Sequence, residues 1–303
     1  SPIHLTWSQV VRSDMMATFF LLATMLVALT FVRTGKRRHF VLACLLAALA
    51  ITSKWPFGVA ELAIFGAVWC RLRNGRIGRR AALLQLLAAA GLTAVLVLCS
   101  SPYLLLDFNT VVADLHGEAQ QHHLGATGHG FFWNVWYYLS GPLWVGLGPI
   151  VLCLAAGGLL LRGARPLFWP VVAFPTAVMF VVIATQHVLW ERWMITIIPV
   201  LTITASTGAR ELWRICTARL PTGACVVFAA DVALAVFLPM LLRDEASAVE
   251  RLHDDRRMAT DWARTHLPPG STVMVEHFAF DLVDAPLDGK FPVGTGGGFD
   301  ARS

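Results

Sequence analysis

The sequence predicts an all-α polytopic membrane protein with about eight transmembrane helices, a large outer loop that carries interfacial helices, and a small α+β extracytoplasmic C-terminal segment. Three observations support this fold class. Of the 303 residues, 56% are hydrophobic and 14% are charged, whereas soluble domains average about 45–50% and about 25%. Apolar stretches near the length of a spanning helix recur along the chain. Arginine and lysine gather in alternate loops between these stretches.

The expected membrane spans follow from the length of each apolar stretch. A bilayer core about 30 Å thick requires roughly 20 mostly apolar residues in a helix that crosses it. Eight stretches come near this length, at residues 14–31, 39–53, 56–70, 81–98, 143–161, 167–185, 193–208 and 223–242. The second and third are the shortest, so a single helix kinked at Pro56 is the alternative for this pair.

Loop charge distinguishes one span from two at Pro56. If the second and third stretches each cross the membrane, the basic turns at residues 33–38 and 71–80 both face the cytoplasm. A single span would place these turns in opposite compartments. With two spans, the inner loops carry 14 Lys or Arg residues and the outer loops of the membrane region carry 3. The positive-inside rule therefore favours two spans and sets the orientation of the chain.

The outer loop at residues 100–142 contains no Lys or Arg, which is typical of an extracytoplasmic segment. Apolar residues recur at helical spacing between positions 108 and 115, and an aromatic run occupies residues 131–138. Both features indicate helices that lie at the level of the lipid headgroups. For the aromatic residues, an interfacial anchor without direct chemistry is the simpler interpretation.

Composition divides the chain into two parts. Residues 1–242 are the expected membrane domain, and residues 243–303 are an extracytoplasmic segment with more charge. Within this segment the pattern predicts an amphipathic helix at residues 251–266 and a strand at residues 271–276. The chain opens with Ser1 rather than Met, so we expect the membrane domain to be incomplete at its N-terminus.

The candidate binding residues share one property: the predicted topology places each of them at an outer end of a span or in the outer loop. They are Arg12, Asp14, Lys54, Tyr103, Asp107, Glu191 and Arg192. The three cations among them are the membrane-region exceptions to the positive-inside trend, and an anion at the outer surface would explain them. A lipid phosphate is a natural candidate. The alternative is that each cation extends to ordinary phospholipid or pairs with a neighbouring acid.

Other features carry less functional information. Glu61 and Asp231 fall inside predicted spans, where an acid is costly, and either a functional or a helix-packing role fits them. Histidines in the outer loop could ligate a metal, but they lack a ligand spacing typical of zinc sites. Walker, Rossmann and nucleophile-elbow motifs are absent from the sequence. We therefore expect no cofactor, no metal and no nucleic-acid partner.

Several short motifs together resemble glycosyltransferase family 39, the family of protein O-mannosyltransferases and aminoarabinose transferases. The run VRSDMMATFF at residues 11–20 resembles the family's outer-facing helix start, and residues 50–56 resemble its span-ending "tKyP" element. Residues 101–107 are similar to the "NPyllld" element that opens the large outer loop. Residues 191–199 are similar to the "rRYllpiiP" pattern, and residues 257–271 look like the linker into the periplasmic tail. The order of these motifs agrees with the family across nearly the whole chain.

The chain also departs from the family pattern. Ser101 stands where the pattern has Asn, and Trp55 and Trp193 stand where it has Tyr. These departures leave the subfamily and the substrate open.

The resemblance implies an inverting membrane transferase of the C-type fold. Such an enzyme moves a sugar from a polyprenyl-phosphate donor to a glycan, lipid or protein acceptor at the extracytoplasmic surface. The resemblance further implies a bacterial inner-membrane location and a catalytic acid in a first outer loop upstream of Arg12, outside this chain. An upstream carboxylate would act as the general base, while Arg12, Lys54 and Arg192 stabilise the departing phosphate.

Two other classes of function remain open. A transporter or flippase would place its polar site near the bilayer midplane on broken helices and would often show internal repeats. The sequence contains no evident repeat, and its polar residues gather at span ends, which favours an interfacial enzyme. A non-catalytic membrane scaffold is the third possibility.

Overall fold

The computed structural model describes residues 13–118, 128–160, 167–252, 258, 262 and 265–268. The chain forms two compact units, Ser1–Leu241 and Leu242–Ser303. The described residues are helical or irregular and include no strand. The strand expected at residues 271–276, and much of the helix expected at residues 251–266, lie outside the described residues.

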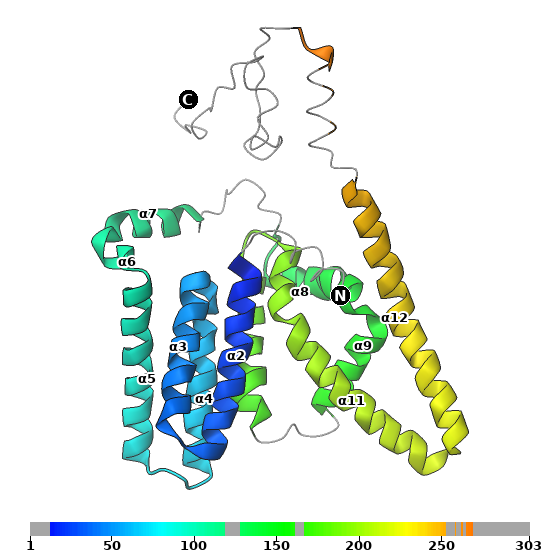
Figure 1. Cartoon of the computed structure of the whole chain (residues 1–303), viewed down its shortest axis with the longest axis horizontal. Helices are drawn as coiled ribbons and strands as arrows, with labels where there is room; N and C mark the ends of the chain where they lie inside the picture. The colour runs from blue at the N-terminus through cyan, green and yellow to red at the C-terminus, as the bar shows by residue number, and fades with distance from the viewer. Residues whose placement is uncertain are drawn as a thin grey trace. The chain divides into compact units, whose positions relative to one another are not determined.

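Helices follow one another along the described part of the first unit (Figure 1). In chain order the elements are α2 (Ser13–Thr34), α3 (Arg37–Ser53), η1 (Trp55–Val59), α4 (Ala60–Arg73), α5 (Arg79–Ser100), α6 (Tyr103–Leu106), α7 (Phe108–Glu118), α8 (Phe131–Ser140), α9 (Pro142–Leu160), η2 (Trp169–Ala173), α10 (Phe174–Ala184), η3 (Glu191–Thr196), α11 (Ile198–Arg219) and α12 (Thr222–Leu252).

Five helices of the described ranges are long and apolar enough to cross a membrane, which indicates an integral membrane protein. They are Ser13–Thr34, Trp55–Arg73, Arg79–Ser100, Pro142–Leu160 and Thr222–Ala246. The other three expected spans are also helical, but they meet this criterion less well. The α3 helix has 17 residues, the apolar helix Trp169–Ala184 is shorter than a full span, and α11 carries several charged residues in its second half. The total of eight spans therefore stays a prediction.

The chain breaks cleanly between α3 and α4. Lys54 follows α3 with φ −164° and ψ 122°, an extended conformation, and the short 3₁₀ turn η1 comes next with Pro56 in its first turn. The α3 and α4 helices lie side by side (Figure 1). A single helix kinked at Pro56 is thus excluded, and the two basic turns stay at the same end of the helices.

Small residues form much of the core around α2. Ala17, Ala28, Ala47 and Ala63 are fully buried, and α2 packs against both α3 and α4. In a membrane, small side chains permit helix backbones to approach closely and gain van der Waals contact. Buried alanines of α2, α3 and α4 therefore let these helices approach closely, and larger side chains such as Leu21 and Ile64 fill the core between them.

The α9 and α11 helices approach each other closely at two glycines, Gly158 and Gly208. A Cβ placed on Gly208 would lie 2.0 Å from the Leu154 carbonyl oxygen, and one on Gly158 would lie 2.1 Å from the Thr204 carbonyl oxygen. A side chain at either glycine would push the two backbones apart. Nearer the start of α9, Gly148 has φ 76° directly before Pro149, and this pair kinks the helix.

The expected helices of the outer loop are present. Figure 1 shows α7 running across the end of α5 rather than along it, and α8 also lies across the direction of the long helices. This orientation suits helices at the headgroup level. The face of α8 that packs inward carries Asn134 and Tyr138, both buried.

Candidate polar site

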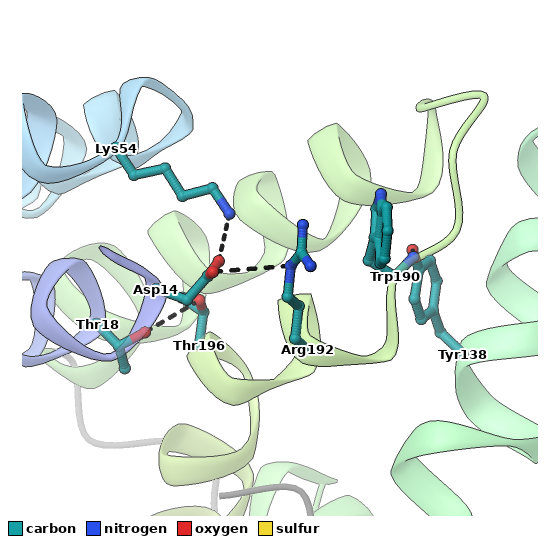
Figure 2. A network of polar contacts seen from close by, with 7 residues as sticks. All are labelled: Asp14, Thr18, Lys54, Tyr138, Trp190, Arg192 and Thr196. Carbon is teal, nitrogen blue, oxygen red and sulfur yellow. Dashed lines mark hydrogen bonds and ion pairs between the residues drawn. The ribbon is translucent and has the colours of Figure 1, made fainter. Parts of the chain in front are cut away.

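Asp14 is the centre of a network of charged side chains. It lies in the first turn of α2, where the helix dipole favours a carboxylate, and it is 5% exposed. Lys54 forms an ion pair and hydrogen bond with its Oδ1. The Arg192 Nε lies 3.8 Å from Oδ2. One buried carboxylate therefore holds two cations that are far apart in the sequence (Figure 2).

The backbone around each cation explains why it reaches Asp14. Lys54 is the extended residue between α3 and η1, so its side chain does not lie on the face of either helix. Arg192 lies in the first turn of η3, directly after the extended residue Trp190. Both positions are interruptions at helix ends, where a long side chain can turn toward a neighbouring helix.

Aromatic rings accompany both cations. The Arg192 guanidinium lies 4.0 Å from the centroid of the Trp190 ring, and the Lys54 Nζ lies 5.9 Å from the centroid of Trp193. Both distances are within the range of cation–π attraction, which is worth about 0.5–1 kcal/mol at exposed sites and more when water is excluded. The rings therefore add to the stabilisation that Asp14 gives to the two positive charges.

A hydroxyl pair joins α2 to η3 one turn below the ions. The Thr18 and Thr196 hydroxyl oxygens are 3.3 Å apart, and both residues are buried (Figure 2). This contact places η3 against α2, so the register of the two elements that carry Asp14 and Arg192 does not depend on the ion pair alone.

The α8 helix anchors the connection that leads into η3. Asn134 Nδ2 donates to the carbonyl oxygens of Ala184 and Gln186, each at 2.9 Å. The Trp190 backbone N–H donates to the Tyr138 hydroxyl at 3.4 Å. Burial raises the pKa of the Tyr138 phenol, so the hydroxyl stays neutral at physiological pH. Asn134 and Tyr138 therefore hold the backbone from which Arg192 extends.

The interfacial anchor that the sequence predicts for the aromatic run does not include this positioning role of Asn134 and Tyr138. A signal was present in the sequence, because Asn134 is the one amide in a run of aromatic residues at 131–138. A buried amide requires hydrogen-bond partners.

A small cavity opens beside the network. Its volume is about 100 Å³, and its polar lining comes from Asp14, Lys54, Gln186, Trp193 and Thr196. Aliphatic and aromatic side chains of η1 and α10 form the remaining wall. A water molecule occupies about 30 Å³ in the liquid, so a few waters or one small anionic group fit this space.

The other predicted site residues do not join this network in the described structure. Tyr103 is 72% exposed, and Asp107 accepts a hydrogen bond from the Thr110 hydroxyl at 2.7 Å. Both follow α5, whereas α3 and α4 contact both α5 and α2 and lie between them (Figure 1). Glu191 is exposed, and its charge acts on Tyr137, whose pKa is raised by burial and by that carboxylate. Arg12 lies outside the described residues.

The two acids inside predicted spans are separate from the Asp14 network. Glu61, in the first turn of α4, accepts a hydrogen bond from the Thr93 hydroxyl at 2.8 Å. Its Oε1 atom is buried and has no hydrogen-bond partner among the described residues. Asp231 is exposed on α12. Within the described part of the chain, no group of three or more His, Cys, Asp or Glu residues has the geometry to hold a metal ion.

No model of a known protein family, no curated protein and no solved structure matches this chain.

Proposed function

We propose that this chain acts as a membrane glycosyltransferase that moves a sugar from a polyprenyl-phosphate donor to an acceptor at the extracytoplasmic face. One observation carries the proposal: Lys54 and Arg192, on separate segments at the predicted outer ends of helices, converge on Asp14 beside a cavity. Cations at this level of a membrane protein suit a lipid-linked phosphate.

Lys54 is the residue best placed to contact such a phosphate. It lines the cavity, and its ammonium group has three N–H donors, of which Asp14 receives one. A cation about 4 Å from a phosphate oxygen gains on the order of 4 kcal/mol at an effective dielectric constant near 20, before the cost of removing water. The remaining donors of Lys54 are therefore the groups that would contact the phosphate.

The two cations would act on the leaving group. In the proposed reaction the acceptor oxygen forms a bond to the anomeric carbon of the sugar, the bond from that carbon to the phosphate oxygen breaks, and polyprenyl phosphate departs with the electron pair. Negative charge grows on the phosphate as the bond breaks, and Lys54 and Arg192 stabilise it. The proton of the acceptor hydroxyl passes to a carboxylate general base, for which the resemblance to glycosyltransferase family 39 implies a position in the first outer loop.

Asp14 has a positioning role in this scheme. Its carboxylate already accepts a hydrogen bond from Lys54 and lies next to Arg192, so both of its oxygens face cations. Its contribution is to hold the two cations together when no phosphate is bound.

A transfer assay tests the proposal. The full-length protein is supplied with purified polyprenyl-phosphate sugars and a panel of acceptors, and Lys54→Ala and Arg192→Ala are compared with the wild type. By analogy with the loss of one stabilising donor, each variant should reduce kcat by about 10²–10³-fold. The matched control is Lys36→Ala, an exposed cation in the predicted cytoplasmic turn. Undiminished turnover in both site variants would remove the phosphate-binding assignment.

A transporter or flippase of a lipid-linked or small polar substrate is the second candidate. The favouring observation is Glu61, an acid in a spanning helix with one carboxylate oxygen lacking a hydrogen-bond partner among the described residues, since such acids often mark transport pathways. Reconstituted vesicles discriminate between the two functions. Movement of a labelled lipid-linked sugar between leaflets without any acceptor, abolished by Glu61→Gln, would favour transport.

A further inference from the structure

A second and larger cavity lies between α9, α11 and α12, with a volume of about 660 Å³. None of its lining residues belongs to the cavity beside Asp14. Its walls are largely aliphatic and aromatic, with Leu147 and Val151 from α9 and Val232 and Phe237 from α12. An apolar space of this size beside a spanning helix is suited to a hydrocarbon chain.

Among the described residues that line this cavity, Arg210 is the only charged one. The two lining hydroxyls nearest to it along α11 are already satisfied, because Thr202 donates to the Ile198 carbonyl oxygen and Ser206 donates to the Ile203 carbonyl oxygen. Among the described residues, no carboxylate lies within ion-pair distance of the Arg210 guanidinium. The cavity thus combines a long apolar wall with one cationic group.

The position of Arg210 along α11 indicates the leaflet. The helix runs from the predicted outer side at Ile198 to the cytoplasmic side at Arg219, and Arg210 is among the cations assigned to the cytoplasm by the positive-inside rule. Trp213, less than one turn further on, lines the same cavity. Trp and Arg are typical of the headgroup level, so the charged part of the cavity lies toward the inner surface.

We propose that this cavity binds an anionic phospholipid of the cytoplasmic leaflet, with its phosphate at Arg210 and an acyl chain along α12. Basic pockets between spanning helices on the cytoplasmic side bind anionic headgroups. A second apolar helix in the same space would enclose the guanidinium without a counter-charge, which is costly in a membrane. A lipid phosphate supplies that charge. This proposal is independent of the transferase function, because it uses neither Asp14 nor the outer surface.

The burial of α12 supports a lipid partner. In the most apolar part of Thr222–Ala246, 6% of the residues are buried inside the protein. A helix with so little protein contact depends on lipid for most of its packing. A bound lipid between α11 and α12 would supply contacts that the protein itself lacks there.

Native mass spectrometry of the whole chain in detergent tests the charge requirement. Phosphatidylglycerol and phosphatidylcholine with identical acyl chains are added in turn, and the retained fraction of each lipid is measured. The wild type should retain phosphatidylglycerol preferentially, and Arg210→Gln should reduce that preference about fivefold, the effect of one cation near an anionic headgroup. Arg219→Gln, on the same helix but outside the cavity lining, should leave it unchanged. Absence of a preference in the wild type, or equal loss in both variants, would overturn the proposal.

A pair of volume variants tests the location. Ala233 lines the cavity and Ala235 is exposed elsewhere on α12. Ala233→Trp should reduce retention of phosphatidylglycerol, whereas Ala235→Trp should not. Unchanged retention in Ala233→Trp would place the lipid elsewhere and contradict the proposal. A dimer in the wild-type spectrum that disappears in Ala233→Trp would also contradict it, because a second copy of the chain would then fill the cavity.

Discussion

The helices α2 and α12 are both apolar enough to cross a membrane, yet they bury very different shares of their residues inside the protein. In the most apolar part of α2, 44% of the residues are buried inside the protein, against 6% in that of α12. The α2 helix has alanine and threonine on its packed side, whereas α12 exposes large residues such as Leu234 and Phe237. Apolarity places a helix in the bilayer, and small residues decide whether another helix can approach it.

The largest expected effect lies in the packed region, at the acid that holds the cations. Asp14→Ala removes the carboxylate shared by Lys54 and Arg192 and leaves two partly buried cations close together. Breaking a buried pair by removing one partner costs about 3–5 kcal/mol. The free energy of unfolding, measured by denaturant titration in detergent micelles, should fall by about that amount.

The control for Asp14 is another acid at the outer surface. Asp107 is exposed and bonded only locally to Thr110 among the described contacts, so Asp107→Ala should change the unfolding free energy by less than about 0.5 kcal/mol. Equal losses in the two variants would show that Asp14 has no special structural role.

The second prediction compares one leucine in each region. Leu21 is 1% exposed in α2, whereas Leu234 is 60% exposed on α12. Leu21→Ala should cost about 3 kcal/mol because it leaves a cavity in a packed core, and Leu234→Ala should cost less than about 0.5 kcal/mol. The same titration measures both. If Leu234→Ala were as costly as Leu21→Ala, α12 would be packed against protein, and the contrast between the regions would fail.

The smallest expected effect concerns α11, which has one closely packed face and one face toward the large cavity. Gly208→Ala places a methyl group against the Leu154 carbonyl oxygen of α9, and the resulting strain should cost about 2 kcal/mol. Gly91→Ala in α5 is the matched control, since nothing lies within 4 Å of its added Cβ. That control should gain about 0.5 kcal/mol by restricting the unfolded chain. A neutral result for Gly208→Ala would mean that α9 and α11 separate easily.

Much of the helix arrangement could be predicted from hydrophobic length and loop charge. All eight expected spans are helical, and the choice of two helices around Pro56 is confirmed by the extended conformation of Lys54. Loop charge is informative here because one inserted or missing crossing would reverse the side of every later basic loop. The lengths of α3 and of the helix at residues 169–184 leave the exact number of crossings as a prediction.

Part of the polar network could also be found without coordinates. Lys54 and Arg192 stand out in the sequence because they are cations at span ends that the predicted topology places outside, against the positive-inside rule. Pairing with a nearby acid is one of the two interpretations that the sequence allows for them. Tyr103 and Asp107 share the same predicted depth but lie beyond α3 and α4 from Asp14 (Figure 1). Depth is a single coordinate, so residues at equal depth can lie on opposite sides of a bundle.

The sequence by itself determined that the chain is helical, belongs in a membrane, and carries its unusual cations at one surface. These features depend on local composition. An apolar stretch of sufficient length is stable across the bilayer, and the charge of a loop determines on which side of the membrane it stays. Only the tertiary structure decided that Lys54 and Arg192 share one carboxylate, that Asn134 anchors the segment behind them, and that Arg210 faces an apolar cavity. Those contacts depend on which helices lie next to one another in the plane of the membrane. That arrangement arises from close approach of helices at alanine and glycine, and no local sequence pattern specifies it.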